Sequence, residues 1–236
     1  MKNTKMYVLI GLLAYCSCQD RQITATAAQF NPNAFVSRVD NKFFPLTPGT
    51  TYFYQGEKDG VPTTDEFIVT HQTQQIAGVK CTVVRDRAFE DGVLVEDTID
   101  WFAQDTDGNV WYFGEDTKEL DANGNVISTE GSWQAGVNGA QPGIIMEAYP
   151  RVGDRYQQEF AVGVAEDMAR VDSLNKAAIV PYGSFDNLLL TREWSPLDPG
   201  TVEQKYYAEG VGFILGVMVK GGDERSELVQ ITTNNH

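Results

Sequence analysis

The sequence predicts an all-β domain made of a single antiparallel curved sheet, in the form of a half-barrel or a β-barrel. From Phe43 onward, turn dipeptides recur at short intervals, and Asp59-Gly60, Asp91-Gly92 and Asp107-Gly108 are typical of them. Asp-Gly pairs adopt the positive φ angles that tight hairpin turns require. Most segments between the turns are too short for helices and are rich in β-branched and aromatic residues, which favour strands.

Six segments between these turns have the clearest strand character. They are residues 51–54, 66–70, 93–103, 110–113, 202–207 and 213–219. Residues 166–178 fit two interpretations, because Met168, Val171 and Leu174 recur at three-residue spacing but also suit a strand that ends in a turn before Val180-Pro181. The chain has no repeat of fixed period, so we expect one domain.

Charge and composition exclude some classes of partner. The 236 residues include 18 Lys and Arg against 33 Asp and Glu, a formal net charge of −15, and 42% of the residues are hydrophobic. This apolar fraction is sufficient for a packed core. A chain this acidic repels phosphate backbones and anionic membrane surfaces, so we expect no nucleic-acid partner and membrane contact only through a lipid anchor.

The N-terminus has the features of an export signal. Lys2 and Lys5 precede a ten-residue uncharged stretch, residues 6–15, which as a helix would span about 15 Å, half of a bilayer core. Residues 13–18, Leu-Ala-Tyr-Cys-Ser-Cys, resemble the lipobox of bacterial lipoproteins. Ser17 fits the small position before an acylated Cys18, while Cys16 is an alternative site. An ordinary secretory signal with two incidental cysteines is the other interpretation.

These features divide the chain into three parts and give it an address. We expect a lipoprotein signal peptide at 1–17, a flexible polar tether at 18–41 and a single β domain at 42–236, held at the bacterial cell envelope as an exported, lipid-anchored protein. Once the lipobox is set aside, Cys81 is a lone thiol and cannot form an internal disulfide. It is expected to be a small buried residue of a strand.

Three segments of the domain carry a family resemblance. They are residues 44–52 (Phe-Pro-Leu-Thr-Pro-Gly-Thr-Thr-Tyr), 180–185 (Val-Pro-Tyr-Gly-Ser-Phe) and 205–212 (Lys-Tyr-Tyr-Ala-Glu-Gly-Val-Gly). They resemble an uncharacterised family of bacterial secreted proteins and lipoproteins with a curved antiparallel sheet, half-barrel or lipocalin-like. The resemblance implies a sheet that wraps around an elongated cavity, and it implies no catalytic residue.

Acidic residues concentrate between Asp86 and Asp121, where 36 residues hold 12 Asp or Glu. A two-residue turn at Asp91-Gly92 would place Asp86 directly opposite Asp97, on one face with Trp101. The next hairpin would place Asp116 diagonal to Asp97 and Lys118 opposite Asp97. These registers follow from turn length, and a one-residue bulge would move the side chains to the other face.

Several interpretations of this acidic cluster are open. Asp86 and Asp97 could serve as a catalytic acid and base, with pKa values driven apart by proximity. Asp86, Asp97 and Asp116 could instead bind Ca²⁺, the one cofactor that the sequence suggests, because Ca²⁺ prefers oxygen ligands. The Asp-rich loops 105–109 and 121–125 are typical of β-turns first and of calcium loops second. The acids could also simply keep an exported domain soluble.

The aromatic residues favour ligand binding. Trp101, Trp111 and Tyr112 are candidates to line a cavity, and the chain has two histidines and no recognised catalytic motif. We therefore expect an envelope-anchored lipoprotein that binds a small amphiphilic or carbohydrate ligand in a concave β-sheet cavity. The first alternative is a carboxylate-dependent hydrolase or lyase, with or without Ca²⁺, that acts on an extracellular substrate. The second is an envelope scaffold protein with no active pocket.

Overall fold

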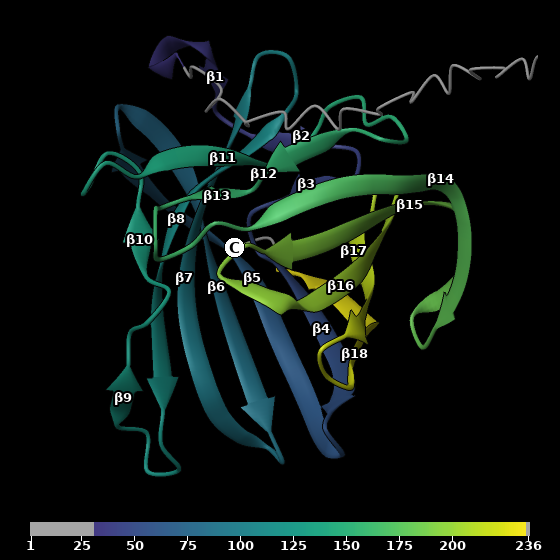
Figure 1. Cartoon of the computed structure of the whole chain (residues 1–236). Coiled ribbons are helices and arrows are strands. Elements are labelled where there is room, and N and C mark those ends of the chain that lie inside the picture. The colour runs from purple at the N-terminus through teal and green to yellow at the C-terminus, as the bar shows by residue number, and fades with distance from the viewer. Residues whose placement is uncertain (1–30, 235–236) are drawn as a thin grey trace, which may run out of the picture.

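The computed structural model describes residues 31–234, which are built almost entirely from β-strands (Figure 1). A 3-10 turn, η1 (Pro32–Ala34), comes first. The strands of the first half are β1 (Phe35–Val36), β2 (Val39–Asn41), β3 (Phe44–Leu46), β4 (Thr50–Lys58), β5 (Val61–Ile76), β6 (Val79–Glu90), β7 (Val93–Asp105), β8 (Val110–Leu120) and β9 (Val126–Ser128). Those of the second half are β10 (Trp133–Gln134), β11 (Gln141–Met146), β12 (Arg155–Gln157), β13 (Glu159–Phe160), β14 (Met168–Val180), β15 (Gly183–Ser195), β16 (Asp198–Ala208), β17 (Gly212–Lys220) and β18 (Glu224–Thr233).

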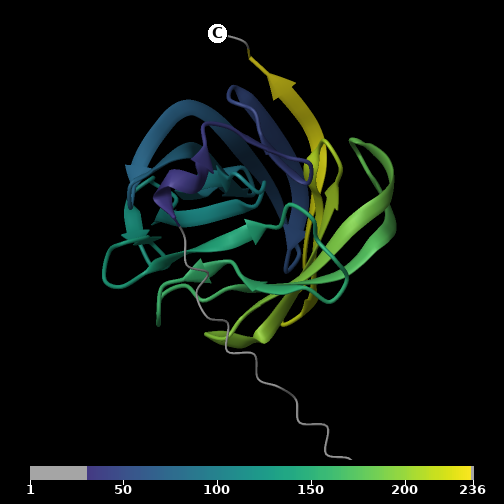
Figure 2. The same cartoon turned by 90° about the horizontal axis from the view of Figure 1, so that it is seen from above.

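The main sheet is antiparallel and strongly curved. Its strands follow the order β12-β14-β15-β16-β17-β18-β4-β5-β6-β7-β8-β11-β13 and bend around a central space, as the view from above shows (Figure 2). The two end strands, β12 and β13, are separated in the chain by Gln158 alone and are not paired with each other. The predicted all-β class with one curved antiparallel sheet is confirmed, and the sheet is not closed into a barrel.

Tight turns set the long hairpins of the first half. Asp59 and Gly60 have φ angles of 51° and 83°, and Asp91 and Gly92 have φ angles of 48° and 77°. Two consecutive positive φ angles define the turn whose twist matches the twist of paired strands. The open interpretation of residues 166–178 is resolved by β14, which pairs with β15 along most of its length.

The segment just before the first long strand belongs to the domain. β1 pairs with β7, and β2 pairs with β3 in a small separate sheet. The Asn41 side-chain amide donates to the carbonyls of Gly108 at 2.9 Å and Glu147 at 3.1 Å. Residues 32–41, the last part of the expected tether, therefore pack against the sheet. The expected signal peptide, Cys16 and Cys18 lie outside the described residues, and within 31–234 no helix is long and apolar enough to cross a membrane.

The packed core draws side chains from both halves of the chain. Its fully buried members include Val69 and Ile76 from β5, Phe113 from β8, Leu188 and Leu189 from β15, Ile214 from β17 and Leu228 from β18. Cys81 is fully buried and has no disulfide partner within residues 31–234, and burial raises the pKa of its thiol to about 12. The thiol is therefore a packed, unreactive group.

Candidate functional site

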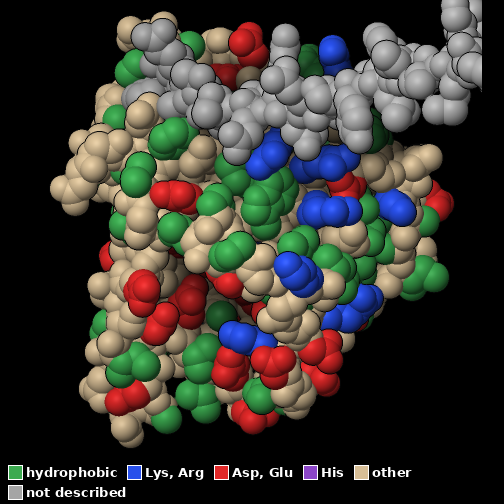
Figure 3. Space-filling view, viewed as in Figure 1, with side chains coloured by type: hydrophobic (Ala, Val, Ile, Leu, Met, Phe, Trp, Pro, Cys, Tyr) green, Lys and Arg blue, Asp and Glu red, His purple; other side chains and the backbone are tan. Residues whose placement is uncertain are grey.

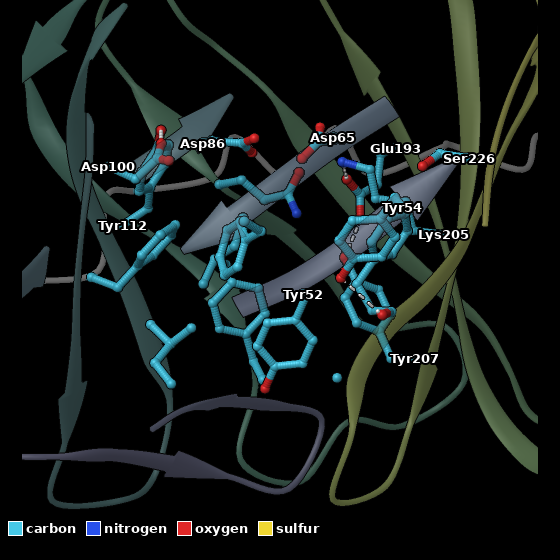
Figure 4. A pocket seen from close by; sticks show the side chains of 18 of the residues that line it. Tyr52, Tyr54, Asp65, Asp86, Asp100, Tyr112, Glu193, Lys205, Tyr207 and Ser226 are labelled. Atoms are coloured by element: carbon cyan, nitrogen blue, oxygen red, sulfur yellow. Dashed lines mark hydrogen bonds and ion pairs between the residues drawn. The ribbon is translucent and has the colours of Figure 1, made fainter. Parts of the chain in front are cut away.

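A cavity of about 390 Å³ lies on the concave side of the sheet. Its aromatic walls come from β3, β4, β5, β7, β8, β16 and β17. Its polar groups come from β5, β6, β7, β13, β15, β16 and β18. Figure 4 shows tyrosine rings and carboxylates, from strands that lie across the cavity from one another, facing the same space. A volume of this size suits a small organic ligand.

The period of two along each strand directs these side chains inward. On β4, Tyr52 and Tyr54 both face the cavity, and their hydroxyls donate to the carbonyl oxygens of Pro45 at 3.2 Å and Phe213 at 3.1 Å. The Tyr54 and Phe213 rings pack with their centroids 5.2 Å apart. The rings are therefore held in place by backbone contacts before any ligand arrives.

Three carboxylic acids from neighbouring strands meet at one side of the cavity. Asp65 (β5), Asp86 (β6) and Asp100 (β7) all line it. Asp86 lies opposite Phe67 on β5 and Thr98 on β7, each of which is two residues away from the acid on its own strand, so the three acids are diagonal neighbours on one face. The Tyr112 hydroxyl donates to Asp100 Oδ1 at 2.5 Å, whereas the buried Asp65 Oδ1 has no hydrogen-bond partner.

This arrangement raises the pKa values of the acids. Burial, then the charge of Asp86 and a hydrogen bond to it, raise the pKa of Asp65 well above its ordinary value. Burial also raises the pKa of Asp86, to about 6, although the hydrogen bond with Asp65 opposes the shift. The pKa of Asp100 is raised by burial and by Asp86, against the hydrogen bond from Tyr112. At neutral pH Asp65 and Asp100 therefore retain protons, whereas Asp86 is largely ionised.

A second polar group lies across the cavity, on β15 and β16. Lys205 Nζ contacts Glu193 Oε2 at 3.0 Å and Glu203 Oε2 at 3.5 Å. Glu193 Oε1 also accepts from the hydroxyls of Thr191 at 2.7 Å and Tyr207 at 3.3 Å. Burial lowers the pKa of Lys205, but the two glutamates outweigh it and hold the pKa well above its ordinary value. Lys205 therefore stays protonated, and its positive charge is balanced by Glu193 and Glu203.

The remaining polar wall comes from the short segment between β12 and β14. Gln158 is 3% exposed, lines the cavity, and its buried Nε2 has no hydrogen-bond partner. A Cβ on Gly143 of β11 would lie 2.2 Å from the Gln158 carbonyl oxygen, so only glycine lets this segment pass so closely. Burial, then the charge of Asp167, raise the pKa of the adjacent Glu159 to about 8.

Acids outnumber bases in the cavity lining. Its eight carboxylic acids are Asp65, Asp86, Asp100, Glu159, Asp167, Glu193, Glu203 and Glu224, and its one basic side chain in the described part of the chain is Lys205. The site therefore offers a ligand carboxylic acids with raised pKa values, a lysine whose charge is balanced by two glutamates, and aromatic faces.

The predicted pairing of Asp86 with Asp97 is wrong. The register shifts by one residue between Ala88 and Phe89, so that Asp86 lies opposite Thr98 and Asp97 lies opposite Arg87. Asp97 consequently projects from the outer face and accepts from Arg85 Nε at 2.7 Å and Arg85 Nη2 at 2.6 Å. The extra residue of this bulge reverses the side-chain alternation that turn length alone predicts.

The predicted metal ligands are not brought together either. Asp116 lies opposite Ile99 and Lys118 lies opposite Asp97, as predicted. However, Asp116 accepts a hydrogen bond from Lys118 Nζ at 2.7 Å and does not line the cavity that Asp86 faces. Across residues 31–234 no three His, Cys, Asp or Glu side chains form a group that could hold a metal ion.

The Asp-rich loops are self-capped turns. Asp105 accepts from the backbone amides of Asp107 at 3.0 Å and Asn109 at 2.9 Å, and from Trp111 Nε1 at 2.8 Å. Asp121 accepts in the same way from the backbone amides of Asn123 and Asn125, each at 2.9 Å. Because their oxygens already close the turns, these loops match the β-turn interpretation.

The three predicted aromatic residues occupy different places. Tyr112 lines the cavity. Trp101 pairs with Val83 and lies outside the lining. Trp111 is also outside it, and its indole packs edge-on against Phe35 with centroids 6.0 Å apart. The bulge that moved Asp97 explains Trp101, because both residues share the outer face.

Sequence reasoning missed most of the polar residues in the site. Asp65, Asp100, Glu193 and Lys205 come from four strands, and their meeting depends on pairings that no local pattern reveals. One signal was present, since Glu193 is the one acid in residues 188–195, a strand segment that begins with three leucines. A charged residue in the inward phase of such a strand is a candidate cavity group.

The similarity of this chain to known proteins is distant. No family model matches the chain, and no curated protein matches it significantly. Two solved structures have a similar arrangement of strands. One is a Bacteroides fragilis NCTC 9343 protein, assigned as an exported protein with a YmcC-like fold, at 13% identity and a TM-score of 0.48, covering 82% of this chain and 100% of that one. The other is a Parabacteroides distasonis ATCC 8503 protein, assigned as a lipoprotein, at 11% identity and a TM-score of 0.45, covering 81% of this chain and 99% of that one.

Proposed function

We propose that this protein is an envelope-anchored binding protein that holds a small amphiphilic or carbohydrate ligand in its concave cavity. The observation that carries the proposal is a cavity of about 390 Å³ with aromatic walls and buried polar atoms that lack partners. Ligand sites combine a mostly apolar lining with a few oriented polar groups.

The unpartnered polar atoms support a ligand of mixed polarity. Asp65 Oδ1 and Gln158 Nε2 are buried without hydrogen-bond partners. A buried polar group left unsatisfied costs about 1–3 kcal/mol, so folded proteins seldom retain such groups without a use for them. A ligand with its own donors and acceptors would satisfy both atoms, while its apolar part would pack on the tyrosines.

The envelope address rests on the N-terminal sequence. The lipobox-like residues 13–18 favour acylation at Cys18, which would place the lipid a short way before residue 31, where the described part of the chain begins. Metabolic labelling with a fatty-acid probe tests this address. Cys18→Ser should abolish labelling and Cys16→Ser should not, whereas labelling that survives both changes would rule out the lipid anchor.

Co-purification tests the binding function directly. The full-length protein, extracted from its native membrane in mild nonionic detergent, should release a stoichiometric small molecule on denaturation, detected by mass spectrometry. Ser226 lines the cavity, so Ser226→Phe should fill part of it and remove the molecule. Asp97→Asn on the outer face is the matched control and should retain it. A molecule present equally in all three proteins, or in none, would contradict the proposal.

A second candidate function follows from one observation. Asp65 and Asp86 are neighbouring carboxylic acids that share a proton, and the pKa of Asp86 is about 6. Carboxyl pairs with separated pKa values serve as acid and base in hydrolases. In a screen of extracellular glycans and esters, Asp86→Asn should abolish turnover and Asp97→Asn should preserve it. Absence of turnover by the wild-type protein would remove this candidate.

A further inference from the structure

We propose that the cavity selects an organic cation, a compound with a protonated amine on an apolar or ring-shaped body. This inference rests on the proposed binding function and names the chemical class of its ligand. It is carried by the charge pattern of the lining, by the unpartnered buried polar atoms and by the aromatic walls around them.

The charge pattern separates the two sides of the cavity. Lys205 is compensated by Glu193 and Glu203 at 3.0 and 3.5 Å and is not free to bind an anion. Asp65, Asp86 and Asp100 have no ion pair with a basic side chain in the described residues. An anionic ligand would meet uncompensated carboxyls, whereas an ammonium group would complete an ion pair that the protein itself leaves open.

The unpartnered atoms indicate where the polar end of the ligand would lie. Asp65 Oδ1 is an acceptor that lacks a donor, and the 3% exposed Gln158 offers Nε2, a donor that lacks an acceptor. In a ligand that carries an ammonium group next to a hydroxyl or ether oxygen, the ammonium group would donate to Asp65 Oδ1 and the oxygen would accept from Gln158 Nε2. Amino alcohols and amino sugars carry both groups, and arylalkylamines carry the ammonium group on an apolar ring.

The aromatic walls suit the same ligand. Tyr54, Phe67 and Tyr112 line the cavity together with the acids, and Figure 4 shows Tyr112 beside Asp100 and Tyr54 near Glu193. The Phe102 and Tyr112 rings are stacked, with centroids 4.8 Å apart. Aromatic faces attract cations within about 6 Å, and they also cover the apolar part of an amine.

Binding of a cation should release protons from the cavity. Burial and mutual repulsion keep protons on Asp65 and Asp100 and raise the pKa of Asp86 to about 6, and an ammonium group reverses the second cause. Other ionisable groups that line the cavity or act on these acids are Tyr52 and Tyr54 (β4), Glu96 (β7), Tyr112 and Glu115 (β8), Glu159 (β13), Asp167, Glu193 (β15), Glu203, Lys205 and Tyr207 (β16) and Glu224 (β18). Lys205 stays charged throughout, so the released protons come from acids.

Matched amine and neutral probes test the inference. Calorimetric titration of the full-length protein in nonionic detergent at pH 7 would use phenethylamine with 2-phenylethanol, and glucosamine with glucose. In at least one pair the amine should bind ten times more tightly or better, a difference of about 1.4 kcal/mol. Its binding enthalpy should also vary with the ionisation enthalpy of the buffer, which reports proton release.

Variants assign the selectivity to the acids. Asp86→Asn should bring the amine and neutral probes of the selected pair to within about twofold of each other, and Asp97→Asn should leave the preference unchanged. The neutral probe reports whether the cavity of Asp86→Asn is still folded, and Asp65→Asn is the second variant if it is not. Equal affinities in both pairs, tighter binding of the neutral probes, or no binding of any probe would each overturn the inference. Co-purification of a neutral molecule would overturn it too, while supporting the binding function.

Discussion

Single carboxyl groups decide how this protein responds to pH. Burial raises the pKa of Asp86 from 3.8 to about 6, of Glu115 from 4.5 to about 7 and of Glu159 from 4.5 to about 8. Because each pKa is higher in the folded chain, the folded state binds more protons than the unfolded state. The stability contribution of these groups is complete below pH 4 and is lost as pH rises through the folded pKa values.

We therefore expect the free energy of unfolding to fall between pH 5 and pH 8. Each carboxyl that is still titrating should contribute a slope of about 1.4 kcal/mol per pH unit. Urea unfolding across this range measures the slope, and Asp86→Asn should reduce it between pH 5 and pH 6. Asp97→Asn should not reduce it, because hydrogen bonds from Arg85 lower the pKa of Asp97. Stability that rises with pH would contradict this account.

Lys205 is the residue whose loss should cost the most. Lys205→Met would leave Glu193, which is 7% exposed, without its cation. Breaking one side of a buried ion pair costs about 3 kcal/mol or more, and the lower figure suits an amino group that reaches the cavity. Chemical denaturation should show this loss. Adding Glu193→Gln should recover part of it, and a double variant no more stable than Lys205→Met would show that the pair is unimportant.

At the scale of the strands, hairpins could be predicted and registers only in part. Asp-Gly turns located β6, β7 and β8, because the turn preference of Asp-Gly is a local property of two residues. The register of β7 with β8 placed Lys118 opposite Asp97 as expected. The register of β6 with β7 failed at one bulge, since an extra residue in a strand leaves no mark on composition. The site itself needed twelve strands to meet, which no single hairpin encodes.

Strands β12, β14 and β15 place three arginines side by side. Arg155 pairs with Arg170, and Arg170 pairs with Arg192. Figure 3 shows Lys and Arg side chains gathered on this half of the molecule. Asp172 contacts Arg192 at 2.8 Å and Arg170 at 3.5 Å and is the acid that separates the like charges.

Asp172→Asn should therefore destabilise the protein by about 1 kcal/mol at low salt, since exposed charges are partly screened by water. The loss should shrink in 1 M NaCl, where the screening length is about 3 Å. Thermal or urea unfolding at both salt concentrations measures the difference. Asp116→Asn, which removes a single exposed pair with Lys118, is the control and should cost less at low salt. A loss that does not depend on salt would exclude charge repulsion as its cause.

At the scale of the whole molecule, the cavity depends on how the two ends of the sheet approach each other. The all-β class could be predicted from local turns. The curvature of the sheet around the cavity could not, because it depends on the pairing of β4 with β18, two strands that lie near opposite ends of the described residues. The hydroxyls of Thr50 and Thr233 lie 3.3 Å apart although 183 positions separate them in the sequence. No pattern in either strand identifies the other as its partner.

Gly143→Ala tests the close contact between β11 and the segment that carries Gln158, at the end of the sheet away from β4 and β18. The added Cβ would lie 2.2 Å from the Gln158 carbonyl oxygen and must displace the segment between β12 and β13. We expect a loss of at least 2 kcal/mol in unfolding free energy, as for overpacked core sites, together with weaker binding of any cavity ligand. Gly222→Ala, where φ is not positive and an added Cβ would make only an ordinary contact of 3.7 Å with Met218 Cγ, is the control for the glycine change itself. Unchanged binding in Gly143→Ala would show that Gln158 is not needed.

The pairing of β4 with β18 also leaves β4 without its second neighbour during much of translation. Residues 224–233 are made long after β4, so a chain that emerges N-terminus first carries an unpaired strand edge until that segment arrives. A product that stops before residue 224 would keep that edge permanently bare and prone to join other chains. The arrival of β18 thus decides when this edge stops being a site of aggregation.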